Sequence, residues 1–178
     1  MQRLKIKLLA GFFTIALLFV LNPIHAQQDK SNRPSPPKQV SSTVDGVEVT
    51  IDYSSPGVKN RTIFGGLESY GKVWRAGANE ATWIEVSDDV KVNGKSLPAG
   101  KYAFFIIPRE NQEWTLIFNS KWDQWGAYNY DESLDVLRVD VKPKKIKHTE
   151  RLEYNINKTG EVSMKWSTTS VPFKISAK

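Results

Sequence analysis

The fold class of this chain is decided by residues 47–53, which read VEVTIDY. Apolar side chains occupy every second position of the segment, and polar side chains occupy the positions between them. Because successive side chains of a β-strand point to opposite faces, this period of two predicts a strand with one buried and one hydrated face.

The same alternation recurs in the C-terminal part of the chain, at residues 137–141, 152–156, 162–166 and 171–175. Residues 102–107 and 114–118 are apolar at nearly every position, which is typical of central strands covered on both faces. Asn93-Gly94 separates two short apolar segments and predicts a tight hairpin turn, since such turns need residues that tolerate positive φ.

These segments together predict an all-β fold. About nine or ten strands follow one another at a spacing of roughly 8–12 residues, which is typical of an antiparallel β-sandwich or jelly roll. No segment has a sustained helical period, and residues 62–70 could form one short helix at most.

The composition excludes several classes of chemistry. The 178 residues contain no cysteine and two histidines, so disulfide frameworks, thiolate catalysis and cysteine-rich metal sites are excluded. Only His148 lies beyond the N-terminal leader, which leaves no material for a histidine triad or a multi-histidine metal site. We therefore expect no metal and no cofactor.

The N-terminal 26 residues have the organisation of a secretory signal peptide. Arg3, Lys5 and Lys7 precede an apolar segment over residues 8–21, and Ala26 suits the last position before cleavage. The apolar segment is shorter than the roughly 20 residues that cross a bilayer, although an uncleaved anchor is the alternative. We expect an exported protein, periplasmic or extracellular, with no transmembrane span after cleavage.

Removal of the leader leaves 22 basic residues against 19 acidic ones, so the net charge falls from +6 to +3. Such a mild charge on an exported protein does not favour nucleic acid as a partner. Lys142, Lys144, Lys145 and Lys147 form the one basic cluster, which is interpreted as a hydrated edge or loop, with a polyanion site as the alternative.

Two boundaries divide the remainder of the chain. Residues 27–38 are polar and contain three prolines, which predicts a flexible tether. Residues 39–178 form the predicted single β-sandwich domain, which is long enough to bury one core without metal or disulfide.

Residues 71–81, here called the first excursion, interrupt the strand pattern. They carry Lys72, Arg75, Asn79 and Glu80, and Gly77 could allow a sharp bend. Arg75 and Glu80 could form an ion pair that pins the loop. Alternatively, Arg75 anchors an anionic or hydroxyl-rich ligand, and Glu80 orients that ligand or acts as a base.

Residues 122–132, here called the second excursion, are rich in aromatic residues. Gln124, Trp125, Tyr128, Tyr130 and Asp131 combine flat ring faces with amide and carboxylate groups. Sugars suit such a surface, because their C–H faces pack on aromatic rings while their hydroxyls need polar partners. The alternative is that these rings cap the open end of the sandwich.

Several segments, matched in order, resemble the bacterial family called domain of unknown function 2911. Residues 74–80 match its signature Trp-Arg-x-Gly-Ala-Asn-Glu, and residues 124–130 match Gln-Trp-Gly-x-Tyr-x-Tyr. The resemblance covers roughly residues 36–175 and also includes residues 53–56, 63–67, 97–102 and 135–139. It implies an exported envelope protein and assigns no activity.

The sequence favours a binding role over an enzymatic one. We expect the nine polar and aromatic residues of the two excursions to bind a ligand or partner in the cell envelope, with a carbohydrate-like ligand favoured. One alternative is a hydrolase that uses Glu80 or Asp131 as acid or base and acts on a glycan. Another is a scaffold that docks to an envelope protein through a sheet edge.

Overall fold

The computed structural model describes residues 30–178, so the expected signal peptide and the first residues of the expected tether lie outside the described residues. Within the described range, no helix has both the length and the apolar character of a membrane span. The elements are β1 (Pro37–Val44), β2 (Val47–Ser54), β3 (Trp83–Val86), β4 (Val90–Val92), β5 (Lys95–Leu97), β6 (Gly100–Ile107), β7 (Trp114–Asn119), the 3-10 helical turn η1 (Glu132–Leu134), β8 (Asp135–Val141), β9 (Lys144–Ile156) and β10 (Glu161–Ala177).

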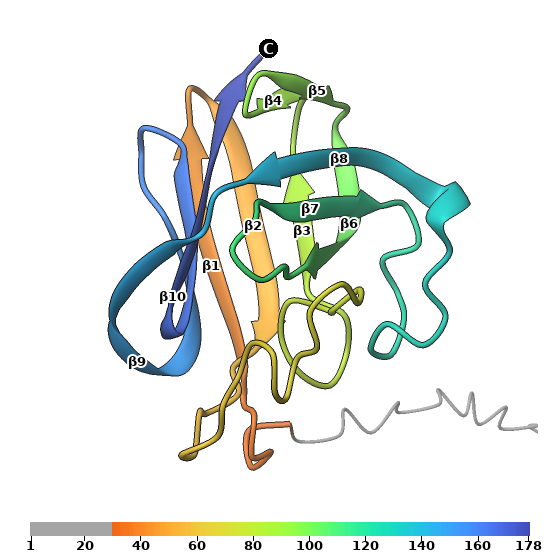
Figure 1. Cartoon of the computed structure of the whole chain (residues 1–178). Coiled ribbons are helices and arrows are strands. Elements are labelled where there is room, and N and C mark those ends of the chain that lie inside the picture. Colours follow the sequence, from red (N-terminus) through yellow and green to blue (C-terminus); the bar gives the residue numbers. More distant parts are fainter. Residues whose placement is uncertain (1–29) are drawn as a thin grey trace, which may run out of the picture.

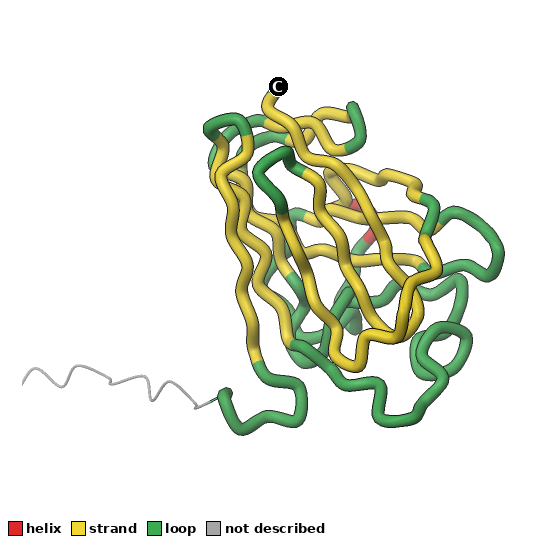
Figure 2. The backbone as a smooth tube through the Cα atoms, turned by 90° about the vertical axis from the view of Figure 1, so that its left-hand side faces the viewer, coloured by secondary structure: helices red, strands yellow, loops and turns green. Residues whose placement is uncertain are grey.

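The strands form two antiparallel sheets that pack face to face (Figure 1, Figure 2). One sheet has six strands in the order β1-β2-β3-β6-β7-β8, and the other has four in the order β5-β4-β10-β9. The main core lies between them and includes Ile51, Phe104, Leu152 and Trp166. The predicted all-β antiparallel sandwich is confirmed.

Local sequence accounts for several of these elements directly. In β2, Val49 and Ile51 are fully buried, whereas Glu48 between the apolar positions is exposed. The β4–β5 turn has φ of 46° at Asn93 and 83° at Gly94, as expected for a hairpin turn that needs positive φ at both central residues.

The central strands β6 and β7 are buried on both faces, as predicted. Phe104 contributes to the main core, whereas Phe105 and Ile117 form a second, smaller cluster on the outer face of the six-stranded sheet. Val73 from the first excursion and Tyr130 from the second pack against this cluster. The two excursions therefore cover the outer face, which explains why both faces are apolar.

Residues 62–70 form turns, so the suggested short helix is not present there. Gly65 has a φ of +82°, which a helix does not accommodate, and its amide donates to the Glu68 carbonyl. Phe64 packs edge to face on three core indoles, Trp74, Trp114 and Trp166. The only helical turn in the described residues is η1.

The sandwich begins earlier than expected. Strand β1 starts at Pro37 instead of near Gln39, and Ser55 donates its amide hydrogen to the Pro36 carbonyl at 2.9 Å. Arg33 also contacts the domain through its side chain, as described below. The expected tether over residues 27–38 is therefore corrected at its C-terminal end. Pro37 and Lys38 pair with β2, whose backbone hydrogen-bonding groups would otherwise lack partners on that side.

Candidate functional site

Within the first excursion the chain pairs with β6 at Trp74, loops away from the sheet, and pairs with β6 again at Thr82. The Trp74 amide donates to the Ile106 carbonyl of β6, and the Phe104 amide donates to the Thr82 carbonyl. The chain between Trp74 and Thr82 therefore bulges away from the sheet. A 3.3 Å hydrogen bond from the Thr82 amide to the Arg75 carbonyl closes the loop.

The base of this loop is tied to the core. The Ala76 carbonyl accepts hydrogen bonds from the Tyr154 hydroxyl at 2.8 Å and from the Thr82 hydroxyl at 3.1 Å. A Cβ on Gly77 would lie 2.6 Å from Thr82 Oγ1, so Gly77 is needed for close packing. Between Trp74 and Thr82 the residues with positive φ are Ala76 and Asn79, which corrects the expectation that Gly77 makes the bend.

The second excursion covers the outer face of β6 and β7 rather than the open end of the sandwich. The Tyr130 ring packs edge to face on Phe105, with centroids 5.2 Å apart. Its hydroxyl donates to Asp135 at 2.6 Å and accepts from Arg138 at 2.6 Å. Burial and the neighbouring Asp135 carboxylate raise the pKa of Tyr130 to about 12, so Tyr130 is a neutral anchor of the loop.

The two excursions meet side by side (Figure 1). The Ala81 amide donates to the Gln124 carbonyl at 3.0 Å, and the Gly126 amide donates to the Asn79 carbonyl at 3.1 Å. These bonds pair Glu80 with Trp125 in a β-bridge. Residues that are more than forty positions apart in the sequence are thereby held in one surface.

Glu80 is paired with the N-terminal segment and not with Arg75. Its carboxylate accepts hydrogen bonds from Arg33 and forms an ion pair with Lys30, all at 2.9 Å. Burial by itself would raise the pKa of Glu80, but the hydrogen bonds from the two cations lower it to about 2. The suggested Arg75–Glu80 ion pair is therefore wrong, and Glu80 anchors residues 30–36.

We expect Glu80→Gln to loosen residues 30–36, with amide hydrogen exchange there faster by about threefold, because two exposed ion pairs are lost. The carboxylate pKa is lower in the folded than in the unfolded protein, so this contribution is complete above about pH 4.5 and is lost as the pH falls toward 2. Hydrogen-exchange mass spectrometry measures the effect. Glu85→Gln, at an exposed position of β3, is the control. Equal exchange rates for residues 30–36 in both variants would contradict the anchoring role.

Arg75 forms no side-chain hydrogen bond or ion pair in the described part of the chain. Its Nε is buried without a hydrogen bond, and its guanidinium forms no ion pair among residues 30–178. Nη1 lies 3.5 Å from where a Cβ on Gly126 would be. Burial raises the pKa of Glu68 to about 7, and Arg75 opposes that rise through space. Arg75 thus keeps its donors available beside the second excursion.

A pocket of about 170 Å³ lies where the excursions meet the edge of the six-stranded sheet, and we call it the excursion pocket. Gln124 lines it and is 8% exposed; its Nε2 donates to the Lys121 carbonyl at 2.6 Å, whereas its Oε1 accepts no hydrogen bond within residues 30–178. Burial raises the pKa of Asp52, which also lines the pocket. The other side chains that line it include Lys30, Glu80, Trp83 and Trp122.

Two indoles, those of Trp83 and Trp122, line this pocket. Trp83 and Trp122 hold the Lys101 ammonium between them, 3.4 Å and 4.1 Å from the two ring centroids. Trp125 and Tyr128 are 52% and 82% exposed, respectively. Trp122, also in the second excursion, is 39% exposed, and Lys101 covers one face of Trp122 and one face of Trp83.

Of the nine residues selected from the sequence, Glu80 and Gln124 line the pocket and the other seven do not. Lys72 is exposed and lies next to Gly71, whose amide donates a hydrogen bond to the Pro108 carbonyl. Asn79 uses its side-chain amide internally, on the Ser35 carbonyl and the Ser54 hydroxyl, both at 3.1 Å.

Asp131 is exposed and caps η1, and hydrogen bonds from the Ser133 hydroxyl and amide lower the pKa of its carboxyl group. Glu80 also has a lowered pKa, so neither carboxyl group suits a general acid at neutral pH. No group of three metal-ligating side chains occurs among residues 30–178.

Sequence reasoning did not select several residues at or beside the pocket, among them Asp52, Trp83, Lys101 and Trp122. Asp52 lies on the polar face of β2, opposite Trp83 of β3. An aromatic residue on a hydrated strand face was the available signal for Trp83, but nothing in the local sequence indicates which loop covers that face.

Comparison with curated proteins and with solved structures gives no match. A family model does match, over residues 35–175, and therefore includes both excursions and nearly every strand. The chain belongs to the family described as protein of unknown function (DUF2911).

Proposed function

We propose that this protein is an exported cell-envelope protein that binds a carbohydrate-like ligand at the excursion pocket without catalysis. The observation that carries the proposal is the exposure of Trp125 and Tyr128 in the second excursion, which also contributes Trp122 and Gln124 to the lining of the pocket. Exposure of large aromatic rings to water is unfavourable, and a ligand with C–H faces would cover them.

The polar groups of the pocket suit hydroxyls. The Asp52 and Glu80 carboxylates line the pocket and can accept hydrogen bonds from hydroxyls. The volume of about 170 Å³ is below the roughly 300 Å³ of typical drug-sized sites, which favours a single ring or the end of a chain.

Arg75 supports the same region as a second donor. Its guanidinium has no partner among residues 30–178 and lies beside Gly126, over which the Tyr128 ring folds. A planar guanidinium next to an aromatic ring can donate to ring hydroxyls or to a carboxylate of the ligand. The pocket and these two residues could therefore contact successive parts of one ligand.

Binding is favoured over hydrolysis, because the two nominated carboxyl groups stay ionised. A general acid needs a pKa near the working pH, whereas the pKa of Glu80 is about 2 and that of Asp131 is lowered. Ionised carboxylates remain useful as hydrogen-bond acceptors for hydroxyls.

Glycan-array and calorimetric binding measurements test the proposal. Trp125→Ala and Tyr128→Ala should each weaken binding by about tenfold or more. Contact with an aromatic ring is worth on the order of 1–3 kcal/mol when a nucleic acid base stacks on it, and we expect a similar contribution for a sugar face. Both variants should keep the thermal midpoint within a few degrees, because the rings are exposed.

Leu67→Ala, at another exposed apolar residue, is the matched control and should leave binding unchanged. If all three variants bind glycans equally well, or if the wild-type protein binds none, the excursion pocket is not a carbohydrate site. Unfolding of the Trp125 and Tyr128 variants would instead place these rings in the structural framework.

A further inference from the structure

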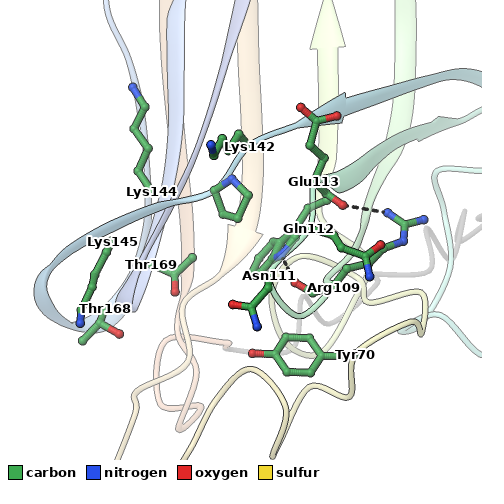
Figure 3. Close-up of a pocket in the computed structure, with 12 residues that line it drawn as sticks. Tyr70, Arg109, Asn111, Gln112, Glu113, Lys142, Lys144, Lys145, Thr168 and Thr169 are labelled. Carbon is green, nitrogen blue, oxygen red and sulfur yellow. Dashed lines mark hydrogen bonds between the residues drawn. The ribbon is translucent and has the colours of Figure 1, made fainter.

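A cavity larger than the excursion pocket shares no lining residue with it. It has a volume of about 630 Å³ and opens between the β6–β7 turn, the β8–β9 connection and the middle of β10 (Figure 3). Trp114, only 3% exposed, forms part of its wall and donates its indole hydrogen to the Arg109 carbonyl at 2.8 Å. The wall is therefore rigid at this point.

Three lysines of this cavity have unpaired charges. Lys142, Lys144 and Lys145 line it, and none of them has an ion pair or a side-chain hydrogen bond within residues 30–178. Glu113 is the one acidic residue that lines the cavity. Arg109 is already engaged, because its Nη1 donates to Thr115 Oγ1 at 2.7 Å and to the Glu113 carbonyl.

Neutral hydrogen-bonding groups face the same space. In Figure 3, Lys145 and Thr169 lie on one side, and Asn111 and Tyr70 lie on the other. The side chains of Tyr70, Asn111 and Thr169 have no hydrogen bond in the described part of the chain. Tyr70 is 38% exposed, so its hydroxyl is accessible to a bound molecule.

We propose that this cavity binds a phosphorylated, hydroxyl-rich molecule of the size and chemistry of a sugar phosphate. Lysine ammonium groups act as point charges and suit the several oxygens of a phosphate group, whereas an arginine fork suits phosphate and carboxylate alike. The one arginine here is occupied by protein acceptors. The amide and hydroxyl groups would then bind the polyol part.

The basic cluster had two interpretations from the sequence, a hydrated edge or a polyanion site. A hydrated edge explains exposed lysines along a strand. Tyr70, Asn111 and Thr169 come from three separate segments and line the same cavity as the lysines, which a strand edge by itself does not require. The tertiary arrangement therefore favours the anion site.

Isothermal titration calorimetry with the whole protein tests this site, with glucose 6-phosphate, glucose and inorganic phosphate as probes at low salt. Glucose 6-phosphate should bind at least about tenfold more tightly than either of the other two, since only it supplies both kinds of contact. Its affinity should fall as the ionic strength rises, because the lysines are partly exposed. Absence of glucose 6-phosphate binding, or equal affinity for all three probes, would overturn the proposal.

Two substitutions separate the cavity from general surface charge. Lys145→Gln should weaken glucose 6-phosphate binding by about tenfold, whereas Lys147→Gln on the same strand, outside the cavity lining, should change it by less than about twofold. Tyr70→Phe, which removes only the hydroxyl, should weaken it by about fivefold. Equal effects of Lys145→Gln and Lys147→Gln would mean unspecific attraction and would refute the site.

The phosphate group could belong to a free molecule or to a lipid headgroup, and vesicle flotation distinguishes these sources. Phosphatidylcholine vesicles with and without phosphatidic acid are the probes. Lysine-dependent binding to the acidic vesicles that exceeds binding of glucose 6-phosphate would assign a lipid source, and the reverse order would assign a soluble one. Binding of neither probe contradicts the proposal.

Discussion

Trp74→Ala is expected to lower the free energy of unfolding by about 3–5 kcal/mol, the usual range for removing a buried indole. The Trp74 side chain is 3% exposed and stacks on Trp166, with centroids 5.7 Å apart and an angle of 18° between the rings. Its Nε1 donates to the Gly77 carbonyl at 3.2 Å, so the substitution also frees one end of the first excursion.

Urea denaturation followed by circular dichroism measures this loss. Trp125→Ala is the matched control: the same residue type is removed from the second excursion, but its ring is 52% exposed, and the expected change is within about 0.5 kcal/mol. Similar stabilities for the two variants would show that Trp74 does not contribute to the core as described.

Asn119→Ala is the second change with a large expected effect, a loss of about 2–4 kcal/mol. Asn119 is fully buried at the end of β7. Its Nδ2 donates to the Asp131 carbonyl at 2.9 Å and to Asp135 at 2.7 Å, and its Oδ1 accepts the Lys121 amide at 3.0 Å. Alanine would remove the hydrogen bonds that tie Lys121, Asp131 and Asp135 together at the two ends of the second excursion.

Hydrogen exchange and glycan binding together test this role. Amides of residues 120–134 should exchange faster in Asn119→Ala, and ligand affinity at the excursion pocket should fall because Gln124 and Trp125 are held less firmly. Asn155→Ala, at an exposed position of β9, should change neither measurement. If exchange in residues 120–134 is unchanged, Asn119 does not organise the loop.

Strands with a strong local pattern were predicted correctly, whereas others needed the tertiary structure. The alternation in β2 and the turn at Asn93-Gly94 are local signals. Strand β1 has few apolar residues and exists because β2 supplies its hydrogen-bonding partner. The two C-terminal patterns form one strand, β10, in which Ser167 has a φ of 55° and the pairing register with β9 shifts.

The candidate site shows the same division. Irregular, polar and aromatic composition was enough to select the two excursions from the sequence. It was not enough to find the partners of Glu80, because Lys30 and Arg33 lie in a segment whose composition predicts a tether. Asp52 and Trp83 were missed because they lie on regular strands, where their position opposite each other depends on pairing register.

The sequence by itself determined the fold class, the central strands, the hairpin turn and the two segments that leave the strand pattern. All of these follow from the spacing of side chains along one stretch of chain. Only the tertiary structure decided that Trp74 is buried and Trp125 exposed, and that Lys145, Tyr70 and Asn111 line one cavity. The physical reason is that burial and pairing depend on which distant segment packs against a residue, and the local sequence carries no record of that neighbour.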